Sequence, residues 1–130
     1  MSNVVKGSIP PIVTPFSNGD VDLDTYAKLI EFHVNEGSHG ILVNGTSAEP
    51  STLTVAERNQ LVDVAITASN NSISVVAATG SQSLAESKAL TDHAVTAGAD
   101  ALLIVTPYYI RPPQRGIIEY YHEITKDIDI

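Results

Sequence analysis

The feature that most constrains the fold of this chain is a pattern that recurs four times along its 130 residues. Each repeat has a short apolar run, a loop containing Gly, Pro, Ser or Thr, and a stretch with the periodicity of an amphipathic helix. Because the runs do not alternate strictly between apolar and polar residues, they indicate parallel strands covered on both faces. The runs are residues 9–13, 40–43, 74–78 and 101–105, and a fifth begins near Ile128.

The stretches between the runs carry signals for the start and end of helices. Two of them open with a capping box, in which Ser or Thr is followed three residues later by Glu. Glycine closes the first and third stretches, as is common at helix C-termini. The predicted helices run from Asp22 or Asp24 to Gly37, from Thr54 onward, from Ser83 to Gly98, and from about Gln114 to Thr125, the last with Ile117, Tyr121 and Ile124 on one face.

Alternating strands and helices predict right-handed βαβ units and a parallel sheet. Both an open doubly wound sheet and a barrel fit this order, but the repeats are nearly uniform in length. No Gly-rich phosphate loop follows the first run, which also favours the barrel. A complete barrel needs roughly 200 or more residues. We therefore expect an α/β fold in which residues 1–130 form one domain, the first half, (β/α)4, of a TIM-type (β/α)8 barrel ending at the start of strand 5.

Composition excludes several functional classes. The net charge is −8, from 7 basic and 15 acidic residues, which argues against binding to nucleic acid or to anionic membranes. No apolar run approaches the roughly 18 residues of a membrane span, and residues 1–6 do not resemble a secretory signal. The chain has no cysteine, so disulfides, thiol catalysis and Cys-ligated zinc are excluded. A cytoplasmic location is the default expectation.

In a barrel, the chemistry lies on the loops that follow the strands, and all four such loops here carry hydroxyl groups. The turn Gly45-Thr46-Ser47 offers backbone N–H groups and two adjacent hydroxyls, which could hold a small carboxylate. The more common alternative is a polar turn whose Ser and Thr side chains bond to their own backbone. Both interpretations remain open from the residues alone.

Two aromatic residues and one acid complete the candidate site. Tyr108 and Tyr109 follow the last strand, where a phenol could relay protons or pack in a subunit contact. Glu49 is expected to brace its loop by accepting hydrogen bonds from N–H groups rather than to act as a general base. No histidine pair has ligand-like spacing near a carboxylate at a strand end, so we expect neither a metal nor another cofactor.

Four segments, each at a strand end and in the same order, resemble the dihydrodipicolinate synthase / N-acetylneuraminate lyase family. The resemblance covers nearly the whole chain, and the joint match is much more specific than any single motif. It implies the first half of a barrel whose members form a Schiff base with pyruvate or another 2-keto acid. The segments are residues 7–16, 40–53 (with Gly45-Thr46-Ser47-Ala48-Glu49), 77–81 and 103–112 (with Thr106-Pro107-Tyr108-Tyr109).

The resemblance also implies roles for individual residues. Thr46 and Tyr109 would belong to a hydroxyl relay, and Ser47, with Gly45, would hold the pyruvate carboxylate. Tyr109 would reach across a tight dimer, with Tyr108 beside it at the interface, in a homo-oligomer built as a dimer of dimers. Ser47 replaces the usual Thr and Ala48 the usual Gly; Ala48 would be strained if that position needed a positive φ.

The family's Schiff-base lysine lies on its sixth strand, and a second relay tyrosine follows its fifth; both would lie after Ile130. The resemblance therefore favours the first half of a lyase or aldolase, inactive by itself, that condenses pyruvate with aspartate semialdehyde. A 2-keto-3-deoxy sugar acid aldolase or dehydratase of the same family is the nearest alternative. The rival hypothesis is a complete, non-catalytic half-barrel module.

Overall fold

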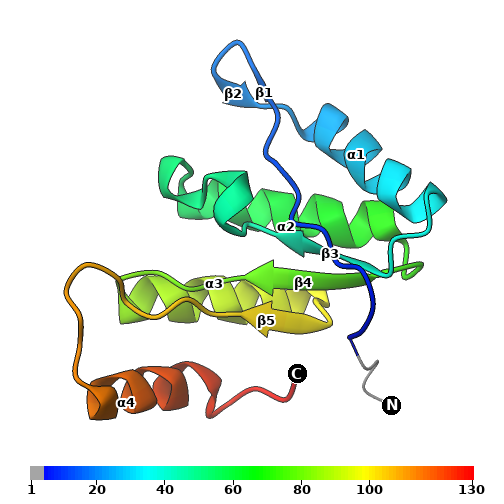
Figure 1. Ribbon diagram of the computed structural model, residues 1–130. Coiled ribbons are helices and arrows are strands. Elements are labelled where there is room, and N and C mark those ends of the chain that lie inside the picture. Colours follow the sequence, from blue (N-terminus) through cyan, green and yellow to red (C-terminus); the bar gives the residue numbers. More distant parts are fainter. Residues whose placement is uncertain (1–4) are drawn as a thin grey trace.

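In the computed structural model, which describes residues 5–130, three parallel strands form a sheet in the order β3-β4-β5 (Figure 1). Helices α2 and α3 connect successive strands, α1 precedes the sheet and α4 follows it. The predicted βαβ repeat is therefore confirmed. The elements are α1 (Leu23–Asn35), β3 (Gly40–Val43), the 3₁₀ turns η1 (Thr46–Ala48) and η2 (Pro50–Thr52), α2 (Val55–Ser69), β4 (Ser74–Ala78), α3 (Leu84–Ala97), β5 (Ala101–Leu103) and α4 (Gln114–Thr125).

The register of the sheet aligns the carboxyl ends of its strands. Val43 of β3 is paired with Ala77 of β4, and Ala78 is paired with Leu103 of β5. In Figure 1 the loops that leave these ends lie together on the left, opposite the chain termini. The loops carrying the candidate site residues therefore meet at one edge.

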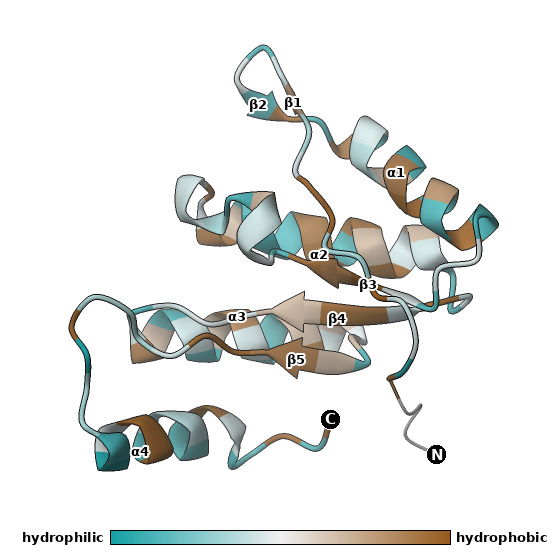
Figure 2. Ribbon diagram, viewed as in Figure 1, coloured by the Kyte–Doolittle hydropathy of each residue, from teal (hydrophilic) through white to brown (hydrophobic). Residues whose placement is uncertain are grey.

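The core lies between one face of the sheet and the helices. Ile41, Val43, Val75 and Ala77 point into it and are at most 1% exposed, and strands β3 and β5 are mostly apolar (Figure 2). Tyr26 of α1 is also buried there, and burial raises the pKa of its phenol. On the other face of the sheet side chains are more exposed, and Leu103 is 50% exposed. Within residues 5–130, no helix is both long enough and apolar enough to cross a membrane.

The predicted helix ends are confirmed, with one difference in detail. Asp22 caps α1 by accepting from the Thr25 N–H at 2.9 Å. At α2, Thr54 and Glu57 form the full capping box, and hydrogen bonds from Thr54 lower the pKa of the Glu57 carboxyl. At α3, Ser83 accepts from the Glu86 N–H at 3.3 Å, but the Glu86 carboxylate faces a buried arginine instead of returning to the cap.

The prediction of a regular first strand at residues 9–13 is wrong. The segment lies beside β3 but makes only an isolated bridge between Pro11 and Leu42, with hydrogen bonds from Ile12 N to Leu42 O and from Leu42 N to Pro10 O. Pro10 and Pro11 have no N–H to donate, so a continuous ladder cannot form.

An antiparallel hairpin follows that segment and was not predicted. Strands β1 (Phe16–Ser17) and β2 (Asp20–Val21) pair across Asn18 and Gly19, which have φ of 53° and 96°. An Asn-Gly pair with both φ angles positive is the preferred two-residue hairpin turn. The signal was therefore present in the sequence, but the two strands are too short to show periodicity.

The last part of the chain differs from expectation in three places. Strand β5 ends at Leu103 rather than residue 105, and residues 126–130 contain no strand. Helix α4 has its predicted bounds, but Tyr120 is buried while Tyr121, predicted on the inner face, is only partly so. Tyr120 faces α3 and the loop after β4, where its hydroxyl lies 2.6 Å from Ser87 Oγ.

The capping box of α2 gives a test of local stability. Thr54→Ala removes the acceptor for the Glu57 N–H and the hydroxyl donor to the Glu57 carboxylate, while the backbone N–H donor remains. The free energy of unfolding should therefore fall by about 1 kcal/mol. Thr67→Ala, on the exposed side of α2, is the control and should change it by less than about 0.5 kcal/mol. Urea unfolding at neutral pH measures both.

Repeating the comparison of wild type with Thr54→Ala at acidic pH tests whether the bond to the Glu57 carboxylate causes the difference in stability. Because the folded-state pKa of Glu57 is depressed, its contribution is present above the unfolded-state pKa and is lost as the pH falls through the folded-state pKa. The difference between wild type and Thr54→Ala should therefore shrink below about pH 4.5, the ordinary value for this carboxyl. A difference that is constant with pH would show that the hydrogen bond from the Thr54 hydroxyl to the Glu57 carboxylate contributes nothing.

Candidate active site at the carboxyl ends of the strands

The turn that follows β3 is closed by its own backbone. Ala48 N donates to Gly45 O at 2.9 Å and Glu49 N donates to Thr46 O at 3.1 Å. The turn begins at Asn44, which has a φ of 57° and is buried, with its amide donating to Arg58 O at 2.9 Å. Asn tolerates this left-handed conformation better than most residues. The amide thus fixes the point where the chain leaves the sheet.

Backbone closure leaves the hydroxyls of this turn free. Thr46 and Ser47 are exposed, and neither hydroxyl donates to or accepts from another of the residues 5–130. The alternative in which these side chains satisfy their own turn is therefore not what the structure contains. Their roles toward a substrate remain predictions.

The backbone conformation at Ala48 shows whether this alanine is strained. Its φ is not positive, and it sits in the 3₁₀ turn η1 with its side chain 2% exposed. The left-handed residue is Glu49, with a φ of 54°. Alanine is therefore unstrained, and its carbonyl accepts a buried hydrogen bond of 2.8 Å from Thr14 Oγ1. That bond ties the loop after the first extended segment to the loop after β3.

Glu49 braces the loop through its backbone. Its carbonyl accepts from Thr52 N at 2.9 Å and from Thr52 Oγ1 at 2.8 Å, which closes the second 3₁₀ turn. The carboxylate is exposed and makes no such bond to residues 5–130. The predicted bracing by the carboxylate is thus not what closes the turn.

A hollow of ≈ 780 Å³ opens between the loops after β3, β4 and β5. Four predicted site residues line it: Gly45, Thr46, Glu49 and Tyr108. Ser47 and Tyr109 are not among its lining residues. The structure therefore brings the predicted residues to the same edge of the sheet, but not all into one cavity.

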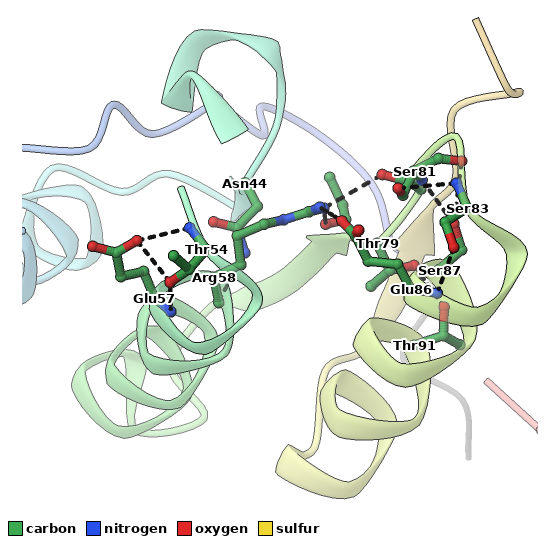
Figure 3. A network of polar contacts seen from close by, with 12 residues as sticks. Asn44, Thr54, Glu57, Arg58, Thr79, Ser81, Ser83, Glu86, Ser87 and Thr91 are labelled. Atoms are coloured by element: carbon green, nitrogen blue, oxygen red, sulfur yellow. Dashed lines mark hydrogen bonds and ion pairs between the residues drawn. The ribbon is translucent and has the colours of Figure 1, made fainter. Parts of the chain in front are cut away.

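Arg58 is the main polar residue of this hollow that sequence reasoning missed. It comes from α2, is 5% exposed, and reaches toward the end of β4 (Figure 3). Its Nη2 donates to Ala78 O at 3.0 Å, and its Nη1 lies 3.7 Å from the Glu86 carboxylate. Burial lowers the pKa of the guanidinium, and Glu86 partly opposes that shift. The sequence signal that could have identified Arg58 is the position of a charged residue on the inner side of a predicted helix.

Two unpartnered polar atoms remain in this region. Among residues 5–130, Asn44 Oδ1 and Arg58 Nε are buried without a hydrogen-bond partner. One accepts and the other donates, and both residues line the hollow. Buried polar groups normally have partners, so these two atoms are exceptions beside a hollow that Leu103 and Val105 also line.

Tyr108 and Tyr109 occupy different environments. Tyr108 is 51% exposed and lines the hollow, whereas Tyr109 is 93% exposed. Tyr109 has a φ of 69°, and Ile110 N donates to Tyr108 O at 2.9 Å across it. A three-residue turn with positive φ at a non-glycine centre is rare and strained. The loop therefore holds the Tyr109 ring away from the other described residues, 5–130.

Gly80 controls how closely two of the loops approach. A Cβ at this position would lie 2.4 Å from Val105 N and 2.8 Å from Val105 O. Those are backbone atoms of the loop after β5, which cannot move aside as a flexible side chain can. Only glycine permits this contact between the loops after β4 and β5.

Within residues 5–130, no group of three or more His, Asp or Glu side chains is arranged to hold a metal ion. The polar groups that line the hollow at this edge of the sheet include the hydroxyl of Thr46, the buried Arg58 and the carboxylates of Glu49 and Glu86.

Parallel strands joined by helices, with polar loops gathered at their carboxyl ends, define the chain as the first half of a (β/α)8 barrel. A crystal structure of dihydrodipicolinate synthase from Aquifex aeolicus superposes with a TM-score of 0.92 at 42% identity, covering 95% of this chain and 42% of that one. The chain belongs to the dihydrodipicolinate synthetase family, whose model matches residues 4–130. The predicted family and fold class are confirmed.

Two further relatives show what share of a family member's length this chain covers. It is 41% identical over 125 residues to the 4-hydroxy-tetrahydrodipicolinate synthase of Syntrophobacter fumaroxidans, covering 96% of this chain and 43% of that protein. A chloride-inhibited dihydrodipicolinate synthase from Acinetobacter baumannii, solved with pyruvate, has a TM-score of 0.92 at 39% identity, covering 98% of this chain and 44% of that one. The chain thus spans less than half the length of these relatives.

The contact at Gly80 gives a test of the loop arrangement. Gly80→Ala should lower the free energy of unfolding by about 1–3 kcal/mol because the added methyl overpacks against backbone. Gly116→Ala is the matched control, since its Cβ would meet nothing closer than 3.5 Å and alanine favours the helix. Thermal unfolding of both variants measures the difference, and equal midpoints would contradict the close approach.

Proposed function

We propose that this chain forms the first half of the active site of a 4-hydroxy-tetrahydrodipicolinate synthase, a lyase that condenses pyruvate with aspartate semialdehyde through a Schiff base. The observation that carries the proposal is the backbone-closed turn after β3. It presents two free hydroxyls, on Thr46 and Ser47, where barrel enzymes bind substrate. The names of the relatives and the pyruvate in one of their structures support the choice of reaction.

The proposed roles follow from the chemistry of each group. Ser47 Oγ and the N–H groups beside Gly45 would donate to the carboxylate of pyruvate, which neutral donors can hold without a fixed cation. Thr46 Oγ1 and the Tyr109 phenol would pass protons to and from the reacting carbon and oxygen atoms. Hydroxyls suit this relay because each both donates and accepts.

The nucleophilic lysine of the proposed reaction lies outside this chain. Lys6, Lys28 and Lys126 are exposed, and Lys88 is paired with Asp127 at 3.8 Å. Lys126 donates to Glu123 at 2.7 Å, and this hydrogen bond raises the pKa of its ammonium. Imine formation needs the neutral amine, which burial favours and a carboxylate partner opposes. These environments support the proposal that none of the four is the Schiff-base residue.

The exposure of Tyr109 fits a shared site between subunits. A ring that is 93% exposed on a strained turn loses no packing by leaving its own subunit. We propose that it enters the active site of a neighbouring copy, in a tight dimer within a dimer of dimers. Tyr108, on the same loop, would contact the partner from the edge of the hollow.

Borohydride trapping tests the proposed Schiff base. Incubated with pyruvate and borohydride, the full-length protein should gain one covalent adduct, on a lysine outside residues 1–130, while residues 1–130 alone should gain none. Peptide mass spectrometry locates the adduct, and omission of pyruvate is the control. An adduct on Lys6, Lys28, Lys88 or Lys126 would contradict the assignment, and absence of any adduct on the full-length protein would contradict the reaction class.

Tyr109→Phe in the full-length protein tests the relay. It keeps the ring but deletes the hydroxyl, so kcat should fall by about 10²–10⁴. Trapping by pyruvate and borohydride should persist because the lysine and the carboxylate pocket are unchanged. Tyr108→Phe is the matched control and should stay close to wild type in steady-state kinetics. If Tyr108→Phe is the damaging change instead, the relay role belongs to the other tyrosine.

A further inference from the structure

The loop between β5 and α4 holds an unfavourable backbone conformation at two places. Tyr109 and Arg111 have φ of 69° and 46°, and neither is a glycine. Non-glycine residues in such regions cost of order 1–3 kcal/mol each and persist only where the surrounding structure holds them. Something outside residues 105–113 must therefore keep this loop in place.

One hydrogen bond joins the two ends of the loop. Tyr121 of α4 donates its hydroxyl to Ile104 O at 2.6 Å. Ile104 directly follows β5, and the strand pairing with β4 ends one residue earlier at Leu103. The loop leaves the sheet at Ile104 and ends where α4 begins at Gln114. The phenol of Tyr121 thus fixes the start of the loop to the helix at its end.

The adjacent tyrosine makes a different connection. Tyr120 donates to Ser81 O at 2.7 Å, in the loop after β4, and its hydroxyl lies 2.6 Å from Ser87 Oγ. The two rings meet edge to face, with centroids 5.7 Å apart. Tyr120 therefore anchors α4 to its neighbours, while only Tyr121 reaches the segment that carries Tyr109.

We propose that Tyr121 is a positioning residue for Tyr109. The inference rests on the proposed function, in which Tyr109 relays protons. By holding Ile104 O against α4, the Tyr121 hydroxyl sets the span of the loop and so the place of the Tyr109 ring. Without that bond the strained turn relaxes, and the ring moves from the position that its chemistry requires.

A double-mutant cycle in the full-length protein tests this inference. Tyr121→Phe keeps the ring and loses the bond to Ile104 O, and kcat should fall about 10- to 100-fold, as for other small misplacements of reacting groups. KM for pyruvate and borohydride trapping should not change. In the Tyr109→Phe background, Tyr121→Phe should have no further effect, because the group that it positions is already absent.

Hydrogen exchange gives a readout that is independent of turnover. In Tyr121→Phe, the Ile110 amide, which donates to Tyr108 O across the turn, should exchange faster, while the amides of α3 are unchanged. Tyr120→Phe is the control: it should lower the thermal midpoint without changing the exchange of Ile110 and without coupling to Tyr109 in kcat. Faster exchange throughout the chain would mean general destabilisation and would overturn the proposal.

The outcomes separate this inference from the proposed function. If Tyr109→Phe retains wild-type kcat, the relay itself is wrong and the positioning role falls with it. If Tyr109→Phe is severely impaired but Tyr121→Phe is silent, or if their effects on kcat multiply, the relay stands and the positioning role is wrong. Full coupling in kcat, together with faster exchange at Ile110, supports both.

Discussion

The parallel pairing of β3, β4 and β5 is the constraint on which the rest of the structure depends. Because Val43 is level with Ala77 and Ala78 is level with Leu103, the loops that follow the three strands leave the sheet at one edge. The hollow, the free hydroxyls and the tyrosine loop all arise from that alignment. Arg58 reinforces it, since the guanidinium binds the last carbonyl of β4 while the backbone carbonyl of Arg58 accepts from Asn44 at the end of β3.

At this edge of the sheet, the hydrogen bonds that hold the loops do not use the hydroxyls of the candidate site residues. The turn after β3 closes with main-chain hydrogen bonds, so Thr46 and Ser47 are free of local partners. The start of the loop after β5 is bonded to α4 through Tyr121, and Tyr109 is 93% exposed. Both arrangements keep the hydroxyls of Thr46, Ser47 and Tyr109 exposed at the carboxyl ends of the strands.

Sequence reasoning found the features with local or periodic signals. The βαβ order, the bounds of α4 and the caps at Thr54 and Ser83 are all in the structure, and Asp22 is the one of the two predicted alternatives that caps α1. The prediction of a regular strand at residues 9–13 was wrong. It followed the apolar character of the segment, although its two prolines have no N–H to donate to a neighbouring strand. The hairpin at Asn18-Gly19 was not predicted because its strands have two residues each, too few to show periodicity, although the turn signal was present.

Of the candidate site, the sequence located the loops but not their contacts. Ser83 and Glu86 have the spacing of a capping box, yet the Glu86 carboxylate faces Arg58 from another helix. The sequence by itself determined the repeat, the helix caps and the presence of hydroxyls at strand ends, because these depend on backbone preferences within a few residues. Only the tertiary structure decided that Arg58 meets Ala78, that Tyr121 meets Ile104 and that Gly80 meets Val105. Each of those contacts joins residues from separate elements, so it depends on how helices and strands pack, which local periodicity does not specify.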